Sequence, residues 1–243
     1  MIGKNIKTIG DSVFFECKNL KSIILPESVT SIGDWSFSYC GNLQSIEIPD
    51  SVTSIGTWAF KDCHNLKSIK IPDLVTFIGD GALCKVKKIE ISDEHQYFYK
   101  GPNGELISRC ENKLVYLPFE YQGSYAIPYG ITIIGGFALC GCYKLEHLEI
   151  PDTVTAIEAG AFSDCEKIEY INIPNSVVAI RTFAFCQCTN LKTIVIPDSV
   201  KHIGESVFLG CLNLKSIQVS ENCKIAAILR HTHKGHKLES KKL

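Results

Sequence analysis

The sequence predicts a solenoid, a fold in which short coils of chain stack on one another and share a parallel β-sheet. Prolines recur every 23 residues, at Pro26, Pro49 and Pro72 and again at Pro128, Pro151, Pro174 and Pro197. Apolar residues recur at fixed distances from each proline, as Val52, Ile55, Phe60 and Leu66 do after Pro49. A unit of this length cannot bury these side chains alone. The units must therefore stack in register around a common core.

Each unit is expected to contribute one short strand. Its last two apolar positions, such as Ile46 and Ile48, are β-branched and two residues apart, which indicates a half-buried strand. The following proline ends the strand because it has no N–H to donate. The pattern occurs eight times, in two blocks of four. We therefore expect a curved superhelix of eight coils, with the sheet on its concave side and short irregular, helical or strand pieces on its convex side.

The spacing of the cysteines indicates that they pack in the core. Seven of the 12 occupy one position of the unit, namely Cys17, Cys40, Cys63, Cys142, Cys165, Cys188 and Cys211. Equivalent side chains in adjacent coils are about 4.8 Å apart, wider than the roughly 3.8 Å between the Cβ atoms of a disulfide. We therefore expect reduced thiols that pack as small core side chains. Disulfides and metal ligation are the alternatives, and no ligand pairs occur at zinc-site spacing.

One unit shows a family pattern clearly: Ile48-Pro49-Asp50-Ser51-Val52-Thr53-Ser54-Ile55-Gly56, then Ala59-Phe60, Cys63, Asn65-Leu66 and Ser68-Ile69-Lys70-Ile71-Pro72. It resembles the BspA-like, or Treponema pallidum-type, leucine-rich repeats. The resemblance covers residues 1–91 and 128–219 and implies a right-handed leucine-rich-repeat solenoid. For many members it also implies a surface protein that binds host or matrix proteins. The fourth unit is three residues short around Cys84 and lacks the cysteine position.

Composition excludes several classes. With 45% hydrophobic residues and a net charge of −1, the chain can form a core and has no charge-driven reason to bind nucleic acid. No apolar run reaches the roughly 20 residues of a membrane span. The first residues lack the pattern of a secretory signal. The compartment therefore stays open between the cell surface, which the resemblance favours, the cytoplasm, and a fragment of a longer chain.

Residues 92–127 interrupt the repeat with seven aromatic side chains. Two apolar segments, 106–108 and 113–117, flank a turn and predict a β-hairpin. This aromatic island is either a structural splice between the repeat blocks or a binding platform. Residues 220–243 are expected to form a cap with a short helix at 225–229, followed by a solvated basic tail. A metal site or a nucleic-acid or membrane contact in the tail is the alternative.

The sequence contains no catalytic motif, so we expect no enzymatic activity, cofactor or metal. Strand alternation instead exposes two rows of mostly small polar residues. The central stretch of these rows carries mixed charge and one aromatic residue and lies beside the island. Together with two island tyrosines it is the predicted ligand-binding surface: Lys70, Lys88, Glu90, Tyr97, Tyr99, His147, Glu149 and Tyr170. We expect an interaction scaffold that binds a protein ligand there. The alternative is a structural spacer or surface-coat module without a tight ligand.

Overall fold

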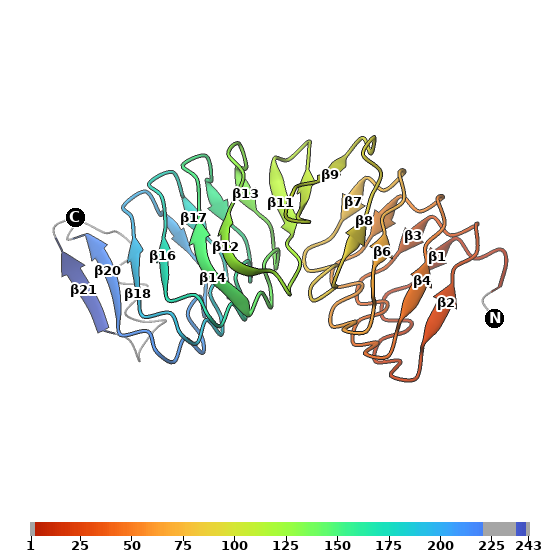
Figure 1. The fold of residues 1–243 in the computed structure, drawn as a ribbon, viewed down its shortest axis with the longest axis horizontal. Helices are drawn as coiled ribbons and strands as arrows, with labels where there is room; N and C mark the ends of the chain where they lie inside the picture. Colours follow the sequence, from red (N-terminus) through yellow and green to blue (C-terminus); the bar gives the residue numbers. More distant parts are fainter. Residues whose placement is uncertain (1–2, 221–236, 242–243) are drawn as a thin grey trace. The chain divides into compact units, whose positions relative to one another are not determined.

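The computed structural model describes residues 3–220 and 237–241 of the chain. Two compact units are present (Figure 1). Unit 1 comprises Met1–Cys110 and Val115–Phe119, and unit 2 comprises Glu111–Leu114 and Glu120–Leu243. Each unit is a stack of coils joined by parallel strands, which confirms the predicted solenoid.

Unit 1 contains two rows of parallel strands. The first row consists of the pairs β2 (Ser22–Ile24) with β4 (Ser45–Glu47) and β6 (Ile69–Lys70) with β8 (Ile89–Glu90). The second row is a four-stranded sheet of β1 (Thr8–Ile9), β3 (Ser31–Ile32), β5 (Ser54–Ile55) and β7 (Phe77–Ile78). Residues one period apart are paired, as Ile23 with Ile46. Ile69 instead pairs with Ile89, 20 residues later, because the fourth 23-residue repeat is three residues short.

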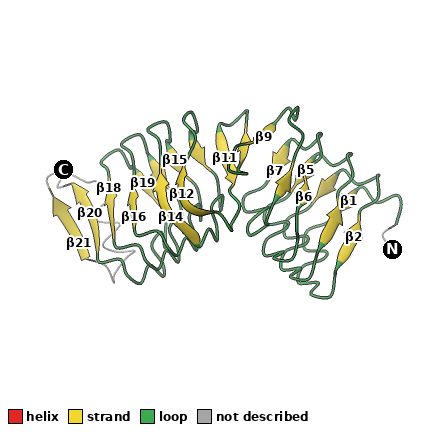
Figure 2. Cartoon of the chain, in the orientation of Figure 1, coloured by secondary structure: helices red, strands yellow, loops and turns green. Residues whose placement is uncertain are grey.

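Unit 2 continues the same arrangement. Its first row consists of β12 (Gln122–Ala126) with β14 (Lys144–Glu149), and of β16 (Tyr170–Asn172), β18 (Thr193–Ile196), β20 (Ser216–Ser220) and β21 (Lys237–Lys241). Its second row contains the first residues of β11 (Lys113–Tyr116), then β13 (Ile133–Ile134), β15 (Ala156–Ile157), β17 (Ala179–Ile180) and β19 (His202–Ile203). Figure 2 shows strands, turns and loops and no helix in the part of the chain that is described. The segments that the sequence analysis expected on the convex side are therefore two-residue strands and turns.

The turns explain why no helix forms there. In almost every coil two residues four positions apart have positive φ, as Trp35 (58°) and Tyr39 (60°) do. Left-handed residues interrupt a right-handed helix, so the nearby N–H groups turn toward the next coil. The N–H of Trp35 donates to the carbonyl of Thr57 at 2.9 Å, and that of Tyr39 donates to Lys61 at 2.8 Å. The turns thus form a third set of coil-to-coil hydrogen bonds.

The core is built from ladders of equivalent side chains. The rings of Phe37 and Phe60 stack with centroids 5.4 Å apart, and those of Phe162 and Phe185 with centroids 5.2 Å apart. The interplanar angles are 4° and 7°, and all four rings are buried. Near-parallel stacking requires successive coils to lie in register. The predicted inward positions are therefore confirmed.

Two segments outside the regular repeats also form strands. Within the aromatic island, β9 (Phe98–Lys100) pairs antiparallel with β10 (Leu106–Ser108), and β12 pairs with a repeat strand of unit 2. Residues 237–241 of the expected tail form β21, which pairs parallel with β20. Leu238, the apolar residue of this segment, pairs in register with Ile217. The expected helix at 225–229 lies outside the described residues.

Candidate functional site

The cysteine ladder has a structural role. The buried Sγ of Cys63 donates to the carbonyl of Phe37 at 3.1 Å, and that of Cys188 donates to Phe162 at 3.2 Å. Burial raises the pKa of Cys63 to about 12. The eleven cysteines within the described ranges all have free thiols. A protonated thiol is a weak nucleophile, so buried ladder thiols such as Cys63 and Cys188 act as packed hydrogen-bond donors.

The strand face has the predicted alternation. In β16, Ile171 is buried while Tyr170 and Asn172 are exposed. Tyr170 pairs in register with Thr193, and Thr193 with Ser216. Parallel pairing therefore holds equivalent strand positions in one row, in which Tyr170 is exposed, Thr193 half-buried and Ser216 buried.

Five predicted surface residues lie in unit 1. Lys70 is exposed and forms an ion pair with Asp50 at 3.2 Å, and Lys88 lies 3.6 Å from Glu90. A hydrogen bond from Ser68, and then the charge of Lys88, lower the pKa of Glu90. The island residues complete this group. Tyr97 is 40% exposed, and the ring of half-buried Tyr99 lies 4.8 Å from the guanidinium of Arg109.

The other three predicted residues lie in unit 2. His147 and Glu149 are exposed on β14, and Tyr170 is 62% exposed on β16. Lys192 Nζ lies 5.7 Å from the Tyr170 ring and 2.6 Å from Glu169, and the hydrogen bond to Glu169 raises the pKa of Lys192. Five of the predicted residues therefore belong to unit 1 and three to unit 2.

A groove lies at the end of the strand face in each unit. In unit 1 a groove of about 280 Å³ is lined by residues that include Ile24, Glu47 and Lys70. In unit 2 a groove of about 510 Å³ is lined by residues that include Asn172 and Val195. The sequence analysis identified the strand residues but not the grooves. The grooves are shaped by the path of the loops that follow the repeat prolines, which the sequence pattern does not give.

Sequence reasoning also missed an aromatic cluster, which we define as Phe15, Trp35, Tyr39, Trp58 and Lys61. It lies on the turns of the first three coils of unit 1, where Trp35 and Trp58 stack 5.1 Å apart. A signal was available, because both tryptophans of the chain occur at the same repeat position.

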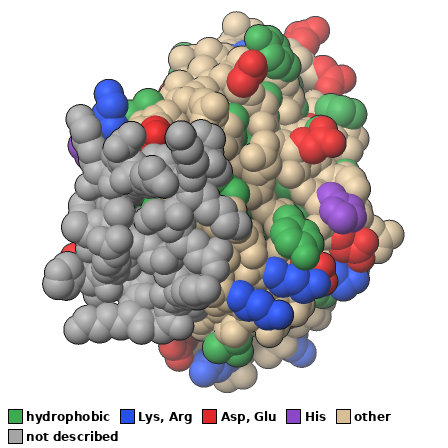
Figure 3. All heavy atoms as spheres, turned by 90° about the vertical axis from the view of Figure 1, so that its left-hand side faces the viewer, with side chains coloured by type: hydrophobic (Ala, Val, Ile, Leu, Met, Phe, Trp, Pro, Cys, Tyr) green, Lys and Arg blue, Asp and Glu red, His purple; other side chains and the backbone are tan. Residues whose placement is uncertain are grey.

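On the face drawn in Figure 3, Lys, Arg, Asp and Glu side chains lie in several places among backbone and uncharged side chains. Residues 3–220 and 237–241 contain no group of three or more His, Cys, Asp or Glu side chains placed to hold a metal. Those residues also include no helix long and apolar enough to cross a membrane.

A solenoid of 23-residue coils with stacked aromatic, thiol and leucine ladders defines a leucine-rich-repeat protein. The family model described as "BspA type Leucine rich repeat region" matches residues 1–101 and 121–234 in six copies. The chain belongs to this family, as the sequence pattern predicted. No curated protein matches the chain significantly.

Solved bacterial structures share the fold. A leucine-rich cell surface protein of Faecalibacterium prausnitzii is 28% identical (TM-score 0.70), and the match covers 88% of this chain and 63% of that chain. The pneumococcal vaccine antigen PcpA is 26% identical (TM-score 0.77), with 89% and 55% covered. A leucine-rich-repeat protein of Eubacterium ventriosum is 26% identical (TM-score 0.74), with 91% and 66% covered. The chain thus spans between about half and two thirds of these relatives.

Proposed function

We propose that the chain is a non-enzymatic interaction scaffold of a bacterial cell surface and that it binds a protein ligand through its outward strand face. One observation carries this proposal: parallel pairing fixes equivalent strand positions in rows, and exposed residues of these rows, such as Asn172 and Lys70, line grooves. A rigid surface loses little conformational entropy when a partner binds. The surface-protein titles of two similar structures support the cellular location.

In unit 2 the contact is expected around His147, Glu149 and Tyr170, next to the groove at Asn172. An exposed tyrosine beside a groove is typical of residues that dominate binding energy, because the ring buries a large area with few rotatable bonds. In unit 1 the corresponding group is Lys70, Lys88 and Glu90, with Tyr97 and Tyr99 of the island.

The test begins with a crosslinked pull-down from host matrix and serum proteins, followed by affinity measurements on the partner that is recovered. We expect Tyr170→Ala to weaken that affinity by about tenfold or more, which corresponds to roughly 1.4 kcal/mol. Thr193→Ala is the matched control, because Thr193 is the register neighbour of Tyr170 in the same row. Unchanged affinity in Tyr170→Ala, Glu149→Ala and Tyr97→Ala variants would reject this surface.

The strand face also supports a second candidate, a structural spacer. At the start of the row in unit 1, Ser22 pairs with Ser45, and both are small and exposed. A uniform small polar face is expected of a module that separates other domains without a tight ligand. Recovery of one stoichiometric partner in the pull-down would exclude the spacer function.

A further inference from the structure

The aromatic cluster has the composition of a recognition site. Phe15 meets Trp35 and Tyr39 edge-on, with centroids 6.3 and 5.7 Å apart. Lys61 Nζ lies 3.9 Å from the ring centroid of Trp58, 5.1 Å from that of Tyr39 and 5.7 Å from that of Trp35. One ammonium group is therefore surrounded by three aromatic rings.

The backbone under these rings is strained. Trp35, Tyr39 and Trp58 have φ of 58°, 60° and 59°, in the left-handed region that bulky side chains rarely adopt. Equivalent turns place Ser12 or Gly81 at the tryptophan position, so the fold itself does not require a large ring there. Positive φ recurs in the turns of the other coils, so what distinguishes these coils is the tryptophan at that position in two successive turns.

A groove of about 410 Å³ lies beside the cluster. Its lining includes Tyr39, Glu16, Asn42, Asp62 and His64, which come from three successive coils. Tyr39 belongs to both the groove and the aromatic cluster. The volume falls in the range of small-molecule sites, and the lining combines a ring with several hydrogen-bonding groups, as such sites do.

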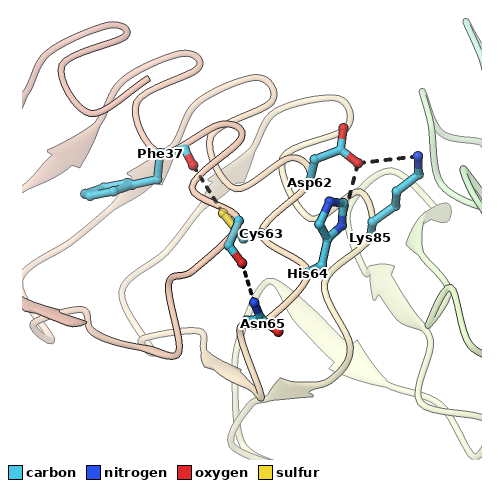
Figure 4. A network of polar contacts seen from close by, with 7 residues as sticks. Phe37, Asp62, Cys63, His64, Asn65 and Lys85 are labelled. Carbon is cyan, nitrogen blue, oxygen red and sulfur yellow. Dashed lines mark hydrogen bonds and ion pairs between the residues drawn. The ribbon is translucent and has the colours of Figure 1, made fainter. Parts of the chain in front are cut away.

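Asp62 is a fixed acceptor in this groove. Only 7% of the residue is exposed, and Oδ1 lies 3.3 Å from Lys85 Nζ and 3.9 Å from His64 Nδ1. Figure 4 shows that the three side chains point toward one another. Among the described residues Oδ2 accepts no hydrogen bond, so it can accept one from a ligand hydroxyl.

Around the groove, the lysine side chain of Lys61 has no carboxylate partner among the described residues, whereas the other charges are paired. Glu16 pairs with Lys18 at 3.4 Å, and Asp62 pairs with Lys85. Lys61 forms no ion pair with a carboxylate in the part of the chain that the structure describes. Its charge is balanced only by the rings, so a ligand carboxylate can bind there without displacing an existing partner.

We propose that the aromatic cluster and this groove form a binding site for a glycan that carries a carboxylate. The apolar C–H face of a sugar ring stacks on an aromatic ring, and its hydroxyl groups bond to planar polar side chains such as Asp62 and Asn42. The carboxylate of the sugar binds Lys61. This site lies on the turns of unit 1 and is independent of the strand face.

The two tryptophans make the test direct. Trp35 and Trp58 are the only tryptophans in the chain, so tryptophan fluorescence, excited selectively over the tyrosines, reports on this site alone. We would titrate the full chain with sialyllactose and with a hyaluronan oligosaccharide, both carboxylated, and with neutral lactose. At least one carboxylated glycan should give a saturable change with Kd of about 1 mM or lower. Lactose should bind about tenfold or more weakly.

Variants locate the binding. Tyr39→Ala should weaken binding of the carboxylated glycan by about tenfold or more, and Lys61→Met should remove the preference over lactose. Asp62→Asn keeps the shape but weakens the acceptor, and it should also reduce affinity. Tyr170→Ala in unit 2 is the control and should bind as the unchanged chain does. Circular dichroism checks that each variant remains folded.

Three results would overturn the proposal. The first is no saturable signal from either carboxylated glycan up to about 10 mM, since weaker binding is not specific recognition. The second is equal binding of lactose, and the third is unchanged binding by both Tyr39→Ala and Lys61→Met. If Tyr39→Ala instead abolishes capture of a protein that neither glycan displaces, the site is a protein-binding surface and the proposal is wrong.

Discussion

At the scale of single residues, position within the coil decides whether a side chain is structural or available for binding. Phe60, Cys63 and Leu66 are fully buried in one coil, whereas their counterparts Phe14 and Cys17 are only partly buried. The same residue type therefore contributes differently to the free energy of unfolding in different coils. Two substitutions in the core ladders test this.

Phe60→Ala should destabilise the chain by about 3–5 kcal/mol, because it leaves a cavity in the aromatic ladder. Urea denaturation followed by circular dichroism measures the loss. Phe14→Ala is the matched control at the same repeat position and should cost clearly less, because Phe14 is half-buried. A loss below about 1 kcal/mol for Phe60→Ala would mean that this position does not support the core.

Cys63 should make stability depend on pH. Burial raises its pKa from 9.0 to about 12 in the folded state. The folded chain keeps this proton while the unfolded chain loses it, so the stabilisation is complete below pH 9.0 and is lost as pH rises toward 12. Each pH unit in that window removes about 1.4 kcal/mol.

Urea denaturation of the unchanged chain and of Cys63→Ala separates this thiol from other titrating groups. The variant should be less stable near pH 8, and the difference between the two proteins should shrink by about 1 kcal/mol near pH 10. A difference that does not change with pH would show that the thiol loses its proton as easily in the folded chain as in the unfolded one.

At the scale of elements, the 23-residue period predicted the strands and their register. Residues at the same position of successive repeats lie one above the other, so their strands pair. The left-handed turns were not predicted. Their positions hold residues as different as Ser12, Trp35 and Gly81, so composition gives no common signal. The aromatic cluster depends on these turns, and for this reason the sequence showed its two tryptophans without showing that they form a site.

Glycines also limit how closely coils approach. A Cβ added to Gly56 would lie 2.6 Å from the backbone N of Asp34, whereas a Cβ added to Gly41 would meet nothing within 4 Å. Gly56→Ala must push two coils apart and should cost about 1–3 kcal/mol in urea denaturation. Gly41→Ala is the control and should be close to neutral. Equal stability of the two variants would contradict coil-to-coil contact at this position.

At the scale of the whole molecule, each coil contacts mainly its neighbours, so stability should vary along the chain. The predicted surface residues belong to both units, as the two blocks of repeats in the sequence led us to expect. β21 was missed because its segment lacks the proline and cysteine positions that marked the other coils.

Local stability gives the last prediction. In the coil that contains Phe14, Cys17 and Leu20 the ladder side chains are half-buried, whereas those of the coil containing Phe60 and Leu66 are fully buried. Opening the former exposes less additional apolar surface and should therefore cost less free energy. Hydrogen exchange measured by mass spectrometry should show peptides from residues 8–24 exchanging about tenfold or more faster than peptides from 54–70. Equal protection of the two segments would mean that unit 1 opens as one cooperative body, and that burial of individual ladder positions does not set the local stability of a coil.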